Sequence, residues 1–125
     1  MAGGIIMREA HFPGRAPIDA YGNGGFRFAE MSHRGSILCV PSGIHGWEPA
    51  ALAEADFDRI LAEAQDIELL LVGTGVELKP LPKAAREALR TAGLTVEAMS
   101  TGAAVRTYNV LLAEDRAVAA ALVAV

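Results

Sequence analysis

Apolar segments of strand length alternate with segments of helical periodicity over the second half of the chain. This order constrains the fold more than any other feature. The segments cover, in order, residues 67–72, 81–92, 95–99, 101–113 and 118–125. The sequence therefore predicts strand, helix, strand, helix, strand. Such an order is typical of right-handed crossovers that join the strands of a mostly parallel sheet.

The ends of these segments carry recognisable signals. Residues 67–72 (IELLLV) are apolar except for Glu68, and the segment stops at Gly73; such a strand is expected where both faces of a sheet are covered. Pro82 stands at the predicted start of the first helix and Gly93 just past its end, which is the usual asymmetry of helix termini. Ahead of these segments, residues 57–64 predict another amphipathic helix.

The first third of the chain has the shorter period of β-strands. Residues 18–21 and 26–31 are predicted strands on either side of the turn-forming residues 22–25 (GNGG). Residues 32–35 (SHRG) predict a second turn, and a strand is predicted over 36–40. Two strands joined by a short glycine-containing loop favour an antiparallel hairpin. We therefore expect a β-hairpin layer here.

The length of 125 residues suits one domain. We expect a flexible arm over residues 1–16, which lack periodicity, and a single α/β domain over residues 17–125. The predicted fold class is α/β: three layers, a mixed sheet whose C-terminal half is βαβαβ, and an N-terminal β-hairpin layer. An apolar fraction of 52% excludes intrinsic disorder.

Charge and residue content exclude several classes of protein. Eleven basic against fifteen acidic residues give a formal net charge of −4, which argues against nucleic-acid binding. The single cysteine, Cys39, excludes an intramolecular disulfide and a multi-thiolate zinc site. His11, His33 and His45 lack the spacing of metal ligands, so we expect neither a metal nor a cofactor.

The hydropathy of the chain does not predict a membrane span. The longest strictly apolar run covers residues 117–125, nine residues, whereas a spanning helix needs about 20. The N-terminus lacks the basic start of a signal peptide. We therefore expect no transmembrane segment and a cytoplasmic location.

The first candidate site is the loop Gly73-Thr74-Gly75, which leaves the C-terminal end of a predicted buried strand. Ligands of open α/β sheets bind beyond the carboxyl ends of the strands, and two glycines let a backbone approach an anion closely. The loop matches neither the dinucleotide nor the Walker pattern. A tight turn is the alternative.

The second candidate is Ser100-Thr101-Gly102, at the predicted start of the last helix. The unpaired N–H groups and positive end of a helix suit an anion. Because this segment also follows a strand end, we expect it to share a crevice with residues 73–75. The alternative is that Ser100 or Thr101 only caps its own helix.

Arg106 and Asn109 lie three residues apart on the same predicted helix, among apolar neighbours. The planar guanidinium of Arg106 can orient a carboxylate or a phosphate, and we expect it to point into the shared pocket. The alternatives are a solvent-facing strip or an ion pair with Glu68 or Glu97.

Other polar residues have simpler interpretations. Asp19, Tyr21, Arg27 and His33 cluster in the β layer and could do acid–base work, but alternate strand positions face opposite ways. Cys39, in the middle of a strand, is typical of a small buried hydrophobe. Trp47 is interpreted as part of the core, with a partner anchor as the alternative. No serine has the context of a nucleophile elbow.

Several segments of the chain, taken together, carry a family resemblance. They are residues 18–27 (IDAYGNGGFR), 41–43 with Trp47, 68–75 (ELLLVGTG), 80–82 (PLP), and 97–111 (EAMSTGAAVRTYNVL) followed by 114–116. They resemble the domain-of-unknown-function family that includes mitochondrial NADH dehydrogenase (respiratory complex I) assembly factor 3 and bacterial and archaeal relatives. The resemblance extends over residues 17–125, and the segment 97–111 is the most specific. Asp115 departs from the glycine that is common in the family.

The resemblance implies a three-layer α/β fold and supplies no catalytic residues. The eukaryotic member is similar to a scaffold that assembles a membrane-associated respiratory complex together with another assembly factor. We therefore expect a non-enzymatic interaction or assembly protein with a protein partner, acting in complex I or membrane-protein biogenesis. Peripheral membrane association through partners and self-association stay open. The alternative is a small-molecule or anion-binding domain, or an enzyme, that uses residues 73–75 and 100–102.

Overall fold

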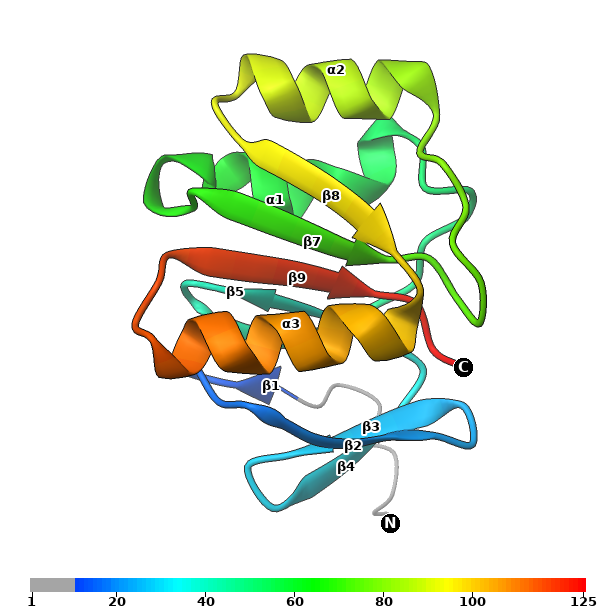
Figure 1. The fold of residues 1–125 in the computed structure, drawn as a ribbon, viewed down its shortest axis with the longest axis vertical. Coiled ribbons are helices and arrows are strands. Elements are labelled where there is room, and N and C mark those ends of the chain that lie inside the picture. The colour runs from blue at the N-terminus through cyan, green and yellow to red at the C-terminus, as the bar shows by residue number, and fades with distance from the viewer. Residues whose placement is uncertain (1–10) are drawn as a thin grey trace, which may run out of the picture.

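A six-stranded mixed sheet at the centre of the molecule joins strands from both halves of the chain (Figure 1). The structure, a computed structural model, describes residues 11–125. The strand order is β1-β6-β5-β9-β7-β8. The strands are β1 (His11–Phe12), β5 (Ser36–Val40), β6 (Gly43–Trp47), β7 (Leu69–Gly73), β8 (Thr95–Met99) and β9 (Val118–Leu122). Strand β7 pairs in parallel with both β8 and β9, whereas β5 pairs antiparallel with β6 and β9. The predicted mixed sheet with a parallel second half is confirmed.

A separate three-stranded antiparallel sheet forms the predicted N-terminal β layer (Figure 1). Its strands are β2 (Ile18–Gly22), β3 (Gly25–Phe28) and β4 (Met31–Arg34). The turn between β2 and β3 lies where it was predicted, at Asn23 and Gly24, with φ values of 53° and 78°. Two successive positive φ values are typical of the tight hairpin turn that follows strand twist.

The second turn was predicted in the wrong place. The sequence predicted a strand over 26–31 and a turn over 32–35, but β3 ends at Phe28 and β4 occupies Met31–Arg34. The turn is formed by Ala29 and Glu30, with φ values of 47° and 62°. Neither residue type favours left-handed backbone, so the sequence gives no signal for it.

The predicted hairpin partner of residues 36–40 was also wrong. Strand β5 pairs with β6 and β9 in the large sheet and not with β3. Strand β6, whose sequence is GIHGW, was missed, because His45 and Gly46 interrupt its apolar alternation. The edge strand β1 pairs with β6.

Helices cover both faces of the large sheet (Figure 1). Helix α3 (Thr101–Ala113) lies on one face, together with the three-stranded sheet, and matches the predicted helix. On the other face lie α2 (Lys83–Thr91) and α1 (Asp58–Ala62). Two short 3-10 turns, Glu54–Phe57 and Ala64–Asp66, flank α1, so the predicted helix over 57–64 is shorter than expected.

Two hydrophobic cores fill the spaces above and below the large sheet. Strand β9 serves both, because its side chains alternate. Val118, Ala120 and Leu122 join the core under α3, whereas Ala119 and Ala121 join the core under α1 and α2. This double burial explains why the C-terminal segment is apolar throughout.

The predicted arm over residues 1–16 is only partly described. Residues 1–10 lie outside the described residues. Within the rest of the arm, His11–Phe12 form β1 on the edge of the large sheet. A domain boundary at residue 17 stays a prediction.

Candidate functional site

The two candidate loops, 73–75 and 100–102, contact each other at the carboxyl ends of β7 and β8. The backbone N–H of Thr101 donates to the carbonyl oxygen of Gly75 over 2.8 Å. In return, Oγ1 of Thr101 accepts the N–H of Gly75 over 3.0 Å. The parallel pairing of β7 with β8 brings both strand ends to the same edge of the sheet.

Gly73 allows this close approach. A Cβ atom at Gly73 would lie 2.8 Å from Cα of Thr101 and 3.1 Å from a methyl carbon of Leu122. The Thr101 side chain is fully buried, and its hydroxyl donates to the carbonyl oxygen of Val123 over 2.8 Å. Thr101 therefore ties the ends of three neighbouring strands, β7, β8 and β9, to the start of α3.

The polar groups of the two loops are largely engaged within the chain. Oγ of Ser100 accepts the N–H of Ala103 over 3.3 Å, so Ser100 caps α3. Oγ1 of Thr74 donates to the carbonyl oxygen of Glu77 and accepts the N–H of Lys79, each over 2.9 Å. These bonds support the capping and tight-turn interpretations of the loops.

Arg106 is exposed and lies one turn along α3 from Gly102. A Cβ atom at Gly102 would overlap the hydroxyl of Tyr21 and would lie 3.5 Å from a guanidinium nitrogen of Arg106. Among residues 11–125, Arg106 forms no ion pair within 4.0 Å; Glu68 pairs instead with Arg116, over 3.7 Å. Arg106 is thus accessible beside the candidate loops.

Asn109 points away from the loops and toward β2. Its Oδ1 accepts the N–H of Ile18, and its Nδ2 donates to the carbonyl oxygen of the same residue, each over 2.9 Å. Both polar atoms of its amide are therefore engaged in holding β2 against α3.

The polar cluster of the β layer divides between the two faces of the three-stranded sheet. Tyr21 and His33 are both paired with Phe26, one on each side of it, and so share its face. Arg27 lies on the opposite face, opposite Ser32. Asp19 is exposed on β2.

Cys39 and Trp47 belong to the cores, as predicted. Cys39 is buried, and burial raises the pKa of its thiol to about 12, which keeps the thiol protonated at neutral pH. Trp47 is buried and packs on Phe57 with ring centroids 5.7 Å apart. Its indole Nε1 donates to the carbonyl oxygen of Asp56 over 2.8 Å.

Two surface cavities lie near these residues, and Arg106 lines neither of them. The smaller, of about 260 Å³, is lined by Pro49, Ala50, Ala51, Leu52, Thr74, Lys79 and Val123. The larger is a groove of about 1050 Å³ beside the three-stranded sheet, and Tyr21, Arg27 and His33 line it. Sequence reasoning missed Arg34 and Arg59 in this groove. No sequence signal brings these two arginines together, since Arg34 lies on β4 and Arg59 on α1.

Within residues 11–125, no three His, Cys, Asp or Glu side chains are grouped so as to hold a metal ion. No helix in the same range is long and apolar enough to span a bilayer.

Fold and site together define a mixed α/β domain in which a three-stranded antiparallel sheet lies beside a larger mixed sheet. The loops 73–75 and 100–102 contact each other at the carboxyl ends of β7 and β8. The family model described as "Protein of unknown function (DUF498/DUF598)" matches residues 18–123. The chain belongs to this family, which includes relatives named as complex I assembly factors. The family resemblance seen in the sequence is confirmed.

Relatives and solved structures cover nearly all of the chain. An uncharacterized protein of Rhodobacter capsulatus is 44% identical over 94% of this chain and 92% of its own length. Mouse NADH dehydrogenase [ubiquinone] 1 alpha subcomplex assembly factor 3 is 29% identical over 95% of this chain and 66% of its own length. A crystal structure described as an outer membrane protein from Bartonella henselae is 63% identical, with a TM-score of 0.87, over 90% of this chain and 98% of that chain.

Proposed function

We propose that this chain is a non-enzymatic interaction or assembly protein, which binds a protein partner during the biogenesis of respiratory complex I or of another membrane protein. The observation that carries the proposal is the similarity to the mouse assembly factor over 95% of this chain. The chain spans 66% of that protein, so the proposal concerns the part of the assembly factor that the two proteins share.

An exposed apolar loop supports a partner surface. After β7 the chain forms a loop on which Val76 is 80% exposed and Leu78 is 60% exposed. The cavity of about 260 Å³ lies against the same loop, with Thr74 and Lys79 in its lining. Large apolar side chains gathered at a surface are typical of sites that bind another protein.

Complementation of a deletion strain of the source organism tests the proposal. We expect deletion to lower the amount of assembled complex I on a native gel, together with its NADH–ubiquinone activity. The wild-type gene restores both, whereas the double variant Val76→Glu, Leu78→Glu does not. Val110→Glu is the matched control, because Val110 is 57% exposed but lies on α3. Unchanged assembly and activity of complex I in the deletion strain would contradict the proposal.

The proposed location is the cytoplasm, with peripheral attachment to the membrane through the partner. Cell fractionation tests this. We expect the protein in the cytoplasmic fraction, or on the inner membrane in a form that high salt releases. Recovery in the outer-membrane fraction would contradict it and would agree with the description of the Bartonella henselae relative.

The contact between the two candidate loops supports a second function, anion binding by residues 73–75 and 100–102. Arg106 is exposed beside Gly102, within reach of a ligand there. A thermal-shift screen against nucleotides, phosphates and small carboxylates tests this candidate. If the loops bind an anion, at least one compound raises the Tm of the wild type and not that of the Arg106→Gln variant. An unchanged Tm with every compound rejects anion binding by these loops.

A further inference from the structure

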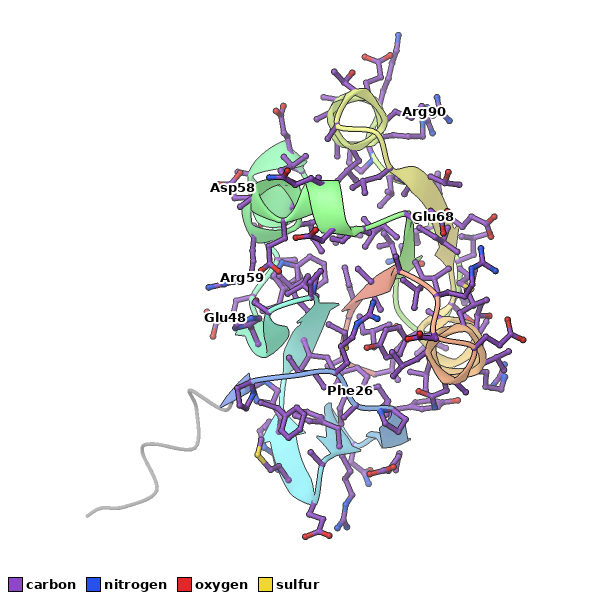
Figure 2. The ribbon with its side chains drawn as sticks, turned by 90° about the vertical axis from the view of Figure 1, so that its left-hand side faces the viewer. Phe26, Glu48, Asp58, Arg59, Glu68 and Arg90 are labelled. Atoms are coloured by element: carbon purple, nitrogen blue, oxygen red, sulfur yellow. The ribbon has the colours of Figure 1, made fainter. Side chains whose placement is uncertain are left out.

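The groove of about 1050 Å³ runs past the end of β6 from one face of the large sheet to the other. On one side it is lined by β2, β3 and β4, and on the other by Arg59 of α1. The segment His45–Glu48 lies between them. Figure 2 shows Glu48 and Arg59 on the same side of the molecule, with Phe26 of β3 below them. The volume of the groove is close to the upper end of the range for small-molecule pockets, roughly 300–1,000 Å³.

Positive charge gathers in this groove although the chain as a whole is acidic. Arg27, Arg34 and Arg59 line it, and Glu48 is its one acidic lining residue among the described residues. The chain carries a formal net charge of −4. Arg27 is paired with Ser32, two residues before Arg34 on β4, so both arginines lie on the same face of the sheet.

None of these three arginines is neutralised by a close carboxylate in the described part of the chain. The ion pairs found within 4.0 Å in residues 11–125 join Lys83 to Glu87 and Arg116 to Glu68. Clustered like charges destabilise a compact protein. A cluster that opposes the net charge of its own chain therefore points to an anionic ligand.

His33 supplies a second and independent observation. Its side chain lines the groove and is only 7% exposed, yet its buried Nδ1 has no hydrogen-bond partner among the described residues. A Cβ atom at Gly35, another lining residue, would lie 3.8 Å from Nε2 of His33. The other ring nitrogen therefore lies at the groove.

The buried nitrogen indicates which tautomer of His33 is present. A buried N–H without a partner is rarer in proteins than a buried acceptor without one. The tautomer with its hydrogen on Nε2 leaves Nδ1 as an unpaired acceptor instead of an unpaired donor, and it is the tautomer that this environment favours. His33 then presents an N–H donor to the part of the groove that lies on the other face of the three-stranded sheet from Arg27 and Arg34.

We propose that this groove binds a small molecule that carries two or more anionic groups, either phosphate or carboxylate. Arg27 and Arg34 bind one group, and Arg59 binds another from the opposite side of the His45–Glu48 segment. One guanidinium group can donate two parallel N–H bonds to two oxygens of a phosphate or a carboxylate. The proposal does not rest on the assembly function.

Titration of the ¹⁵N-labelled full chain with pyrophosphate and with citrate tests the proposal. We expect saturable shifts of groove amides, including those of Gly35 and Gly46, at millimolar ligand and low salt, and smaller shifts at high salt. Acetate, with one charge, produces no saturable shift. Binding of pyrophosphate alone identifies a phosphate ligand and binding of citrate alone a carboxylate ligand, and either supports the proposal.

Single variants locate the site. Arg27→Gln, Arg34→Gln and Arg59→Gln are each expected to weaken binding about tenfold or more, since each removes a charged hydrogen bond. Arg90→Gln, on α2, is the matched control and leaves affinity unchanged. The three groove variants keep or raise the Tm of the unliganded protein, because they relieve repulsion, so weaker binding does not reflect unfolding.

Three results would overturn the proposal. The first is the absence of a saturable shift with either polyanion. The second is binding that Arg106→Gln abolishes and the groove variants leave intact, which places the anion at the loops 73–75 and 100–102. The third is binding of a poly-glutamate peptide with no binding of either small polyanion, which makes the groove a docking site for an acidic segment of a protein.

Discussion

The side-chain amide of Asn109 holds the backbone of Ile18 through both of its polar atoms. Its Oδ1 accepts the N–H of Ile18 and its Nδ2 donates to the carbonyl oxygen, each over 2.9 Å. The two residues are 91 positions apart in the sequence. Because a primary amide offers a donor and an acceptor side by side, this pair fixes the three-stranded sheet against α3.

Asn109→Asp is expected to lower the free energy of unfolding by about 1–3 kcal/mol, because a carboxylate cannot donate to the Ile18 carbonyl and leaves it unpaired. Urea denaturation measures the change. Val110→Ala, at the exposed neighbouring position of α3, is the control and should cost far less. An Asn109→Asp variant as stable as the wild type would mean that the bond from Asn109 to the Ile18 carbonyl does not stabilise the fold.

Gly73→Ala is expected to destabilise the protein by about 1–3 kcal/mol through overpacking. The new Cβ would lie 2.8 Å from Cα of Thr101, and a backbone atom at the start of α3 cannot move aside without disturbing the loop contact. Thermal and urea denaturation measure the effect. Gly14→Ala is the control, because its Cβ would meet only a ring carbon of Phe12, 3.6 Å away. Equal stability of the two variants would show that the close approach of β7 and α3 is not required.

The order of strands and helices after residue 67 could be predicted because burial imposes different periods on the two element types. The match is close for β8 and for α3, Thr95–Met99 and Thr101–Ala113. The turn at Ala29 and Glu30 could not be predicted, since both residues adopt left-handed backbone without the residue types that favour it. Because this turn was not predicted, residues 32–35 were assigned to a turn instead of β4, and β5 was predicted to pair with the strand before them.

The same contrast holds for the candidate sites. Contact between residues 73–75 and 100–102 could be predicted, because parallel neighbouring strands end at the same edge of a sheet. The groove that Arg27, Arg34 and Arg59 line could not be predicted. Arg27 and Arg59 come from elements on opposite faces of the large sheet, and only the tertiary packing around β6 brings them to one cavity.

Asp56 gives the protein a defined dependence of stability on acid pH. Its carboxylate accepts backbone N–H bonds from Ala50, Ala51 and Ala53, each over 3.1 Å. These bonds, above all the bond from Ala50, hold the pKa of Asp56 below its ordinary value of 3.8. A carboxyl group whose pKa is lowered by folding stabilises the folded state at pH values above its pKa in the unfolded state. This contribution is lost as the pH falls through the pKa of the folded state.

Asp56→Asn is therefore expected to lower stability at neutral pH and to make the free energy of unfolding less dependent on pH below about pH 5. Urea denaturation across the acid range measures both effects. Asp19→Asn, on the exposed side of β2, is the control. If the Asp56→Asn variant followed the same acid profile as the wild type, the N–H bonds would not be the source of the pH dependence.

Helices α2 and α3 end in the same hydrogen-bonded motif with different residues at its left-handed position. In α3, the N–H of Arg116 donates to the carbonyl oxygen of Leu111 over 3.0 Å, and Asp115 has a φ of 59°. In α2, Gly93 occupies the equivalent position with a φ of 95°. Glycine is the residue that this position favours.

Asp115→Gly is expected to raise the free energy of unfolding by about 0.5–1 kcal/mol, because glycine adopts the left-handed conformation without a steric penalty. Removal of a negative charge from the C-terminal end of α3 acts in the same direction. Thermal and urea denaturation measure the gain. The reverse change, Gly93→Asp at the end of α2, should lower stability by a similar amount. Asp115→Ala separates the two causes, since it removes the charge and keeps the steric penalty. If the alanine variant gained as much as the glycine variant, the charge and not the backbone conformation would limit the stability of this helix end.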